Sequence, residues 1–283
     1  MVTPMHPDGS LDLEGAAALA AHLVDNGHEG LVVNGTTGES PTTTDLEKVD
    51  LIRVVVEAVG DRVRIIAGAG SNNTAHTIEC AQAAQKAGAH GLLIVTPYYN
   101  KPPQEGILAH FTAVADATDL PVIVYDIPGR TGTPIHTQTL IRMAEHPRIV
   151  AVKDAKGDLF AASEVMSATD LLWYSGDDAL NLAHLTQGAV GIVSVVGHLA
   201  SRQYAEMIAA VGRGDLARAI EIHRQLIPVV NAVMHVTQGP IMVKAALHDL
   251  GIIASDMLRL PLIPATTDQL ASVRAGIEKA GLR

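Results

Sequence analysis

The stretch Gly88-Ala-His-Gly-Leu-Leu-Ile-Val95 contains the unit that decides the fold of this chain. Its first glycine can adopt the left-handed conformation that ends a helix, and its second opens a short apolar strand. Two further stretches repeat the arrangement, namely Gly27-His-Glu-Gly30 and Gly188-Ala-Val-Gly191. The repeat predicts that helices and strands alternate along the chain, and that each strand follows the end of a helix.

Seven apolar segments have the length and composition of strands that are buried on both faces. They are Gly30–Val33, Arg64–Ala67, Gly91–Val95, Pro121–Tyr125, Ile149–Val152, Leu171–Tyr174 and Gly191–Val196, and a short eighth strand is expected at Met1–Thr3. Amphipathic stretches between them predict helices over residues 11–26, 42–59, 74–87, 104–117 and 179–187. Eight alternating strands favour an α/β fold of the (β/α)8 TIM barrel type over an open doubly wound sheet, which stays the alternative.

Beyond residue 198 the pattern changes to helices alone. Helices are predicted over residues 199–233, 239–250 and 267–281, with prolines at 261 and 264 between the last two. We therefore expect residues 1–198 to form the barrel that carries the active site. Residues 199–283 are expected to form a C-terminal helical region that packs on the barrel or on another subunit.

Charge and composition exclude several classes of protein. The formal net charge is −10 without a cluster of Lys and Arg, so neither nucleic acid nor an anionic membrane is an expected partner. No apolar run approaches the roughly 20 residues of a membrane span, and residues 1–9 lack a signal peptide's apolar segment, so a cytoplasmic protein is expected. The thirteen histidines show no zinc-binding spacing, so no metal is expected. The single cysteine, Cys80, is interpreted as a packing residue without an activating base nearby.

Lys153 is the only one of seven lysines that directly ends an apolar strand. Between aliphatic strands its ammonium group loses hydration, which lowers its pKa and makes the free amine available to attack a carbonyl. From position alone, an ion pair with Asp126 or Asp154 is an equally good interpretation. Tyr125 is expected at the same depth on the preceding strand, and it favours the nucleophile because a phenol beside an amine can transfer protons.

Other polar residues follow the remaining strand ends, where a barrel places its active site. Thr36 and Thr37 lie in a glycine-bounded loop and offer hydroxyl and backbone N–H groups to a carboxylate, although an ordinary turn is the better interpretation of this loop alone. Arg130 follows a Pro-Gly turn, and its guanidinium fits a second carboxylate. Asp177 and Asp178 precede a helix and are expected to cap it.

Five motifs at these strand ends resemble the dihydrodipicolinate synthase family of pyruvate-dependent class I lyases. They are Gly35-Thr-Thr-Gly-Glu-Ser40, Val95-Thr-Pro-Tyr-Tyr-Asn-Lys-Pro102, Tyr125-Asp-Ile-Pro-Gly-Arg-Thr131, Val152-Lys-Asp-Ala-Lys-Gly-Asp158 and Ser175-Gly-Asp-Asp178. The resemblance covers nearly the whole chain. It implies a homotetrameric enzyme of lysine and diaminopimelate biosynthesis, which condenses pyruvate with aspartate semialdehyde without a cofactor or a metal.

The resemblance also implies a role for each catalytic residue. Lys153 would form a Schiff base with pyruvate, and Tyr125 would donate and accept protons. Thr36 would link Tyr125 to Tyr99, which in this family reaches in from the adjacent subunit. The dimer would then be part of the active site.

The binding roles that the resemblance implies fall on four other residues. Thr37 and the backbone at Gly176 and Val193 would hold pyruvate, and Arg130 would hold the carboxylate of aspartate semialdehyde. Related lyases that cleave N-acetylneuraminate or 2-keto-3-deoxy sugar acids commonly lack this arginine, so they are the alternative activity. The alternative that is not an enzyme is a barrel that binds a keto acid without turning it over.

Lysine inhibits some members of this family, in which a His and a Glu near the dimer interface help to hold it. The corresponding positions here are Lys48 and His76. A cationic Lys48, together with the loss of that glutamate carboxylate, should repel the ammonium group of the inhibitor. We therefore expect weak or absent inhibition by lysine.

Overall fold

The computed structural model of the protein describes residues 1–282. Contacts along the chain divide it into two compact units. One unit consists of Met1–Arg64 together with the chain from Ser194 onward, and the other consists of Ile65–Val193. Each unit is described by itself below.

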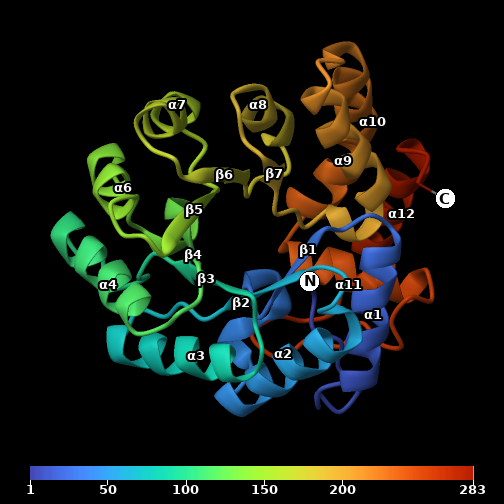
Figure 1. Cartoon of the computed structure of the whole chain (residues 1–283). Helices are drawn as coiled ribbons and strands as arrows, with labels where there is room; N and C mark the ends of the chain where they lie inside the picture. Colours follow the sequence, from blue (N-terminus) through green and yellow to red (C-terminus); the bar gives the residue numbers. More distant parts are fainter. Residues whose placement is uncertain (283) are drawn as a thin grey trace. The chain divides into compact units, whose positions relative to one another are not determined.

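The unit of residues 65–193 is built on a parallel sheet whose strands follow one another in chain order (Figure 1). The strands are β2 (Arg64–Gly68), β3 (Gly91–Val95), β4 (Val122–Asp126), β5 (Ile149–Asp154), β6 (Leu172–Ser175) and β7 (Gly191–Ile192). Helices follow the strands, and α3, α4, α6 and α7 pack against one another in sequence. The helices are α3 (Thr74–Lys86), α4 (Gln104–Asp116), α5 (Pro128–Thr131), α6 (Thr137–Met143), α7 (Leu159–Ala168) and α8 (Asn181–Thr186).

The register of this sheet decides which side chains share a face. Tyr125 of β4 is paired with Lys153 of β5, and Lys153 is paired with Tyr174 of β6. One residue further on, Asp126 is paired with Asp154. Because successive side chains of a strand point to opposite faces, Tyr125 and Lys153 lie on one face and the two aspartates on the other. The predicted equal depth of Tyr125 and Lys153 is confirmed.

The other unit combines one strand with the helices of both ends of the chain. Its regular elements are α1 (Leu13–Asp25), β1 (Gly30–Val33), α2 (Asp45–Val59), α9 (Gly197–Gly212), α10 (Leu216–Met234), α11 (Gly239–Asp249) and α12 (Thr267–Lys279), with the short 3-10 helices η1 (Thr36–Gly38) and η2 (Ser40–Thr42). Helix α1 packs against α2, and α10 packs against both α9 and α12. Helix α2 begins at a capping box in which Thr44 and Glu47 satisfy each other's backbone N–H groups.

Three predicted elements differ from the structure. Residues 1–3 do not form a ladder strand in the described chain, although the amine of Met1 donates to the Val32 carbonyl at 2.5 Å. The Val2 N–H donates to the His198 ring at 3.0 Å and is therefore not available to a neighbouring strand. The seventh strand is shorter than predicted, since the chain turns into α9 at Gly197. The predicted helix over 199–233 is two helices, which a turn at Gly214 (φ +78°) separates.

We also compared the helices with the requirements of a membrane span. Among the described residues, no single helix is both long enough and apolar enough to cross a bilayer. Helices α10 and α11 pass on length and composition only when taken together, and the chain bends by 108° between them.

Candidate active site

The Lys153 side chain ends an apolar strand and lies against the ring of Tyr125. Its Nζ is 4.0 Å from the centroid of that ring. Tyr125 itself is buried, with 6% of its surface exposed, and Lys153 is half-buried. Within residues 1–282 the Lys153 Nζ forms no hydrogen bond or ion pair. The amine and the phenol ring that the sequence places at one depth are therefore direct neighbours.

The electrostatic environment of Lys153 favours its neutral form. Burial lowers the pKa of Lys153 to about 8, because the low-polarity surroundings penalise the ammonium form. The negative charge of Asp178 opposes this shift, and the positive charge of Arg130 adds to it. A larger fraction of Lys153 is therefore free amine at neutral pH than of a lysine at its ordinary pKa of 10.5.

Competitive labelling with acetic anhydride should report this pKa without any substrate. Acetylation of Lys153, mapped by mass spectrometry, should rise about tenfold per pH unit below pH 8 and level off above it, since only the free amine reacts. The exposed Lys86 is the internal reference that corrects for loss of reagent and for recovery of the peptides. A Lys153 midpoint near the ordinary 10.5 would contradict the assigned environment.

The alternative interpretation, in which Lys153 is the ion-pair partner of Asp126 or Asp154, is wrong. The Asp126 carboxylate accepts hydrogen bonds from the Ile135 backbone N–H, at 3.2 and 3.3 Å. The Asp154 carboxylate accepts one from the Lys156 backbone N–H at 2.7 Å. Both aspartates occupy the face of the sheet opposite to Lys153, because they are the next residues along their strands.

Gly176 and Val193 lie at the ends of the two strands that follow Lys153. The Gly176 N–H donates to the Asp154 carbonyl at 2.6 Å, and the Val193 N–H donates to the Ser175 carbonyl at 2.7 Å. A Cβ atom on Gly176 would lie 2.9 Å from Lys153 Cγ, so only glycine leaves room for the lysine. Both N–H groups are occupied within the protein, and any contact that these residues make with a substrate has to come from their other atoms.

Arg130 and Tyr99 are the exposed members of the predicted site within residues 65–193. Arg130 lies in the short helix α5, directly after the strand that carries Tyr125. Tyr99 is 88% exposed and adopts a left-handed backbone conformation (φ +73°), which is uncommon for a residue with a side chain. The neighbouring Tyr98 is only 38% exposed. The loop after β3 thus holds the Tyr99 ring out into solvent.

Thr36 and Thr37 belong to the other unit, where they form η1. The loop that contains them is tied down by Glu39, which is 2% exposed and left-handed (φ +58°). The Glu39 carboxylate accepts hydrogen bonds from Lys244 Nζ at 2.5 Å and from the Arg259 backbone N–H at 3.0 Å. Residues from the C-terminal helical region therefore fix the loop that carries both threonines.

The Glu39–Lys244 pair is a feature that the sequence analysis missed. Lys244 is completely buried in α11 and also donates to the Met257 carbonyl at 2.6 Å. Burial lowers the pKa of Lys244, while the charge and hydrogen bond of Glu39 act to raise it. The sequence contains one signal for this pair, which is a lysine within the apolar run Ile241–Leu247. The signal is weak because it does not identify the partner, which lies 205 residues away.

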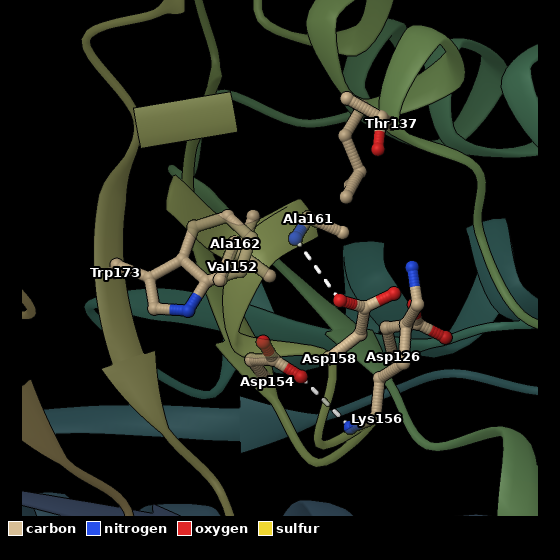
Figure 2. Close-up of a pocket in the computed structure, with 10 residues that line it drawn as sticks. Asp126, Thr137, Val152, Asp154, Lys156, Asp158, Ala161, Ala162 and Trp173 are labelled. Carbon is tan, nitrogen blue, oxygen red and sulfur yellow. Dashed lines mark hydrogen bonds between the residues drawn. The ribbon is translucent and has the colours of Figure 1, made fainter. Parts of the chain in front are cut away.

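A second missed feature is a pocket on the opposite face of the sheet from Lys153. It is lined by Asp126, Thr137, Leu140, Val152, Asp154, Lys156, Asp158, Ala161, Ala162 and Trp173 (Figure 2). Burial raises the pKa of Asp126 to about 7. The signal in the sequence is the polar residue that follows each strand-end candidate, since Asp126 follows Tyr125 and Asp154 follows Lys153.

The environment of Cys80 differs from the sequence interpretation. Its Sγ lies 3.6 Å from Nε2 of His76, one turn earlier on α3, so a base does lie near the thiol. The spacing of four residues is the signal that identifies this pair. The Cys80 side chain is half-buried.

Comparisons with known proteins agree with the strand-end motifs. The model of the dihydrodipicolinate synthetase family matches residues 1–280. The 4-hydroxy-tetrahydrodipicolinate synthase of Kineococcus radiotolerans is 60% identical over 282 residues, which is 100% of this chain and 92% of that protein.

Two solved structures extend the likeness to three dimensions. Dihydrodipicolinate synthase from Cyanidioschyzon merolae, solved with lysine bound, has a TM-score of 0.97 and 44% identity, over 100% of this chain and 97% of the other. The chloride-inhibited enzyme from Acinetobacter baumannii, in complex with pyruvate, has a TM-score of 0.96 and 36% identity, over 100% and 97%. The fold is a TIM-barrel-like α/β fold, as predicted, with seven of the eight expected strands among the described residues, and the chain belongs to the dihydrodipicolinate synthetase family.

Proposed function

We propose that this protein is a class I lyase with 4-hydroxy-tetrahydrodipicolinate synthase activity, which condenses pyruvate with L-aspartate 4-semialdehyde. The observation that carries the proposal is Lys153, whose amine ends a strand beside the Tyr125 ring and has a pKa lowered to about 8. An amine in this state can attack a ketone at neutral pH. The relatives named above support the choice of substrates.

The chemistry needs no metal or cofactor in this proposal. The Lys153 amine adds to the ketone carbon of pyruvate, and loss of water gives a protonated imine. That cation withdraws electrons, so a methyl proton leaves and a neutral enamine forms. The enamine carbon bonds to the aldehyde carbon of the second substrate, whose oxygen takes up a proton and becomes a hydroxyl group, and the imine on Lys153 is restored. The product's own amine then adds to the imine carbon, closes the ring and releases the Lys153 amine.

Each further role follows from the type of side chain and its position. Tyr125 donates and accepts the protons, because its ring is in contact with the amine. Arg130 binds the carboxylate of aspartate semialdehyde, and Thr37 binds that of pyruvate. Gly176 makes room for the Lys153 side chain, and the backbone of Val193 lies at the next strand end.

Direct competition between substrates tests this function. With pyruvate, turnover of aspartate semialdehyde should exceed the cleavage of N-acetylneuraminate or of 2-keto-3-deoxygluconate by about 10³-fold or more in kcat/KM, since only the first substrate matches a single short carboxylate site. Equal or faster cleavage of a sugar acid would identify the protein as the related aldolase. A covalent pyruvate adduct without any turnover would support the keto-acid-binding barrel.

A Tyr99→Phe variant tests the proton relay between subunits. We propose a homotetramer in which Tyr99 enters the neighbouring active site and connects to Tyr125 through Thr36, and its 88% exposure in the single chain supports this. The variant should lose about 10²–10⁴-fold in kcat yet keep the pyruvate adduct, because it lacks only the proton-carrying hydroxyl. Tyr98→Phe is the matched control and should retain turnover. Full activity of Tyr99→Phe would refute the relay.

Three other expectations stay predictions. The boundary near residue 198 between the barrel and the helical region is one. A cytoplasmic location is the second. Weak or absent inhibition by lysine is the third, although Lys48 forms an ion pair with Asp45 at 3.2 Å, which offsets part of its charge.

A further inference from the structure

The loop that carries Arg130 is held at its far end by two charged side chains. The loop leaves β4 after Asp126, forms α5 and reaches Ile135, which is completely buried, before α6 begins. The Ile135 N–H donates to both oxygens of the Asp126 carboxylate, at 3.2 and 3.3 Å. The Ile135 carbonyl accepts a hydrogen bond from Lys156 Nζ at 3.2 Å. Ile135 is therefore hydrogen-bonded to charged side chains through both its N–H and its carbonyl.

The two side chains that bind Ile135 lie at and just after the ends of the strands that carry the proposed catalytic pair, since Asp126 ends β4 and Lys156 follows the end of β5. Asp126 directly follows Tyr125, and Lys156 lies three residues after Lys153. Lys156 is itself fixed, because its N–H donates to Asp154 at 2.7 Å (Figure 2). In the same view, the Asp126 and Lys156 side chains lie side by side in the pocket behind the sheet. Hydrogen bonds thus connect Asp126 and Lys156, which follow Tyr125 and Lys153 along the chain, to Ile135 in the loop that carries Arg130.

We propose that Asp126 and Lys156 are positioning residues that, by holding Ile135, set the place of Arg130 and so determine the affinity for the second, carboxylate-bearing substrate. This inference rests on the proposed function, in which Arg130 binds aspartate semialdehyde. Asp126 points to the face of the sheet opposite to the pyruvate-binding amine, and Lys156 lines the same pocket as Asp126, whereas Lys153 does not. Their loss should therefore separate the two substrates, which a general loss of structure would not do.

The protonation of Asp126 makes its hydrogen bonds with the Ile135 N–H depend on pH. Burial raises the pKa of Asp126 to about 7, the Ile135 hydrogen bonds and the charge of Lys156 act to lower it, and Asp154 acts to raise it. An ionised carboxylate is the stronger acceptor for the Ile135 N–H. The KM for aspartate semialdehyde should consequently fall as the pH rises through 7. The other charged groups of the pocket are Asp158 of the α7 N-cap and, through Asp154, the buried His184 of α8, whose Nε2 is 3.9 Å from that carboxylate.

Three variants of the whole 283-residue chain test the inference. Asp126→Ala removes the acceptor, and the KM for aspartate semialdehyde should rise about tenfold or more, as a misplaced binding group does, with little change in the KM for pyruvate. Asp126→Asn keeps an acceptor oxygen, so it should restore the KM at pH 8 while abolishing its pH dependence around pH 7. Asp158→Asn, which removes the same charge from the same pocket and can still cap α7, should match the wild type.

The outcomes separate this inference from the proposed function. Before kinetics, each protein is treated with pyruvate and borohydride. A wild type without an adduct on Lys153 would mean that the proposed function has failed. An adduct in every protein, with an unchanged KM for aspartate semialdehyde in Asp126→Ala, would overturn the positioning role alone.

A fourth variant covers the case in which Asp126→Ala does not fold. Lys156→Met removes the donor to the Ile135 carbonyl while keeping the apolar part of the side chain. It should also raise the KM for aspartate semialdehyde selectively. Equal increases in both KM values, or none, would contradict the proposal.

Discussion

A Lys153→Arg variant should lose about 10⁴-fold or more of its turnover and form no adduct with pyruvate. The guanidinium group keeps the positive charge and much of the length of the lysine, but it stays protonated in proteins and cannot serve as a nucleophile. The variant would thus keep a positive charge beside the Tyr125 ring but would lack an amine that can react with pyruvate. The measurement is the steady-state rate with pyruvate and aspartate semialdehyde.

The same exchange at Lys86 provides the control for this result. Lys86 is exposed near the end of α3, so Lys86→Arg should leave the rate unchanged. Turnover of Lys153→Arg within tenfold of the wild type would contradict the assignment of the nucleophile. Retained turnover together with an adduct elsewhere would point to another lysine.

A Lys244→Met variant should destabilise the protein by about 3–5 kcal/mol, the largest effect on stability that we expect from a single change. Lys244 and Glu39 are 0% and 2% exposed, and the methionine would leave the Glu39 carboxylate buried without its countercharge. The loop that carries Thr36 and Thr37 should loosen as well, because Glu39 directly follows η1. Urea unfolding, followed by circular dichroism, measures the free-energy difference.

A double variant separates the charge from the packing. Glu39→Gln combined with Lys244→Met removes both charges, so it should recover much of the stability lost in the single variant. Lys86→Met, at an exposed position, should change stability by no more than about 0.5 kcal/mol. A single variant as stable as the wild type would show that the pair contributes little, and an equally unstable double variant would assign the loss to packing.

Much of the fold was predictable because the buried strands are short and apolar, and because glycine opens β1, β3 and β7. The segments Gly30–Val33 and Gly91–Val95 were predicted with the boundaries that the structure has. The division between α9 and α10 was missed even though Gly214-Asp215 signals it, since Asp215 caps α10. Apolar periodicity continues across that turn and suggests one long helix, whereas the glycine and the cap end it.

The candidate site was predictable only where a strand itself aligns the side chains. Tyr125 and Lys153 could be placed together because parallel neighbouring strands end at the same level. The hydrogen bonds of Asp126 and Lys156 to Ile135 could not be predicted, because they depend on how a loop folds back between two strands. The Glu39–Lys244 pair joins residues 205 positions apart, and no local pattern indicates such a contact.

Trapping the imine tests the central claim most directly. The protein is incubated with pyruvate, reduced with borohydride, digested and analysed by mass spectrometry. We predict that the added mass lies on Lys153, in the peptide that contains Val152-Lys-Asp154, and that none lies on Lys244, whose amine is held by Glu39. An unmodified Lys153 after complete reduction, or a modified Lys244 in its place, would contradict the account.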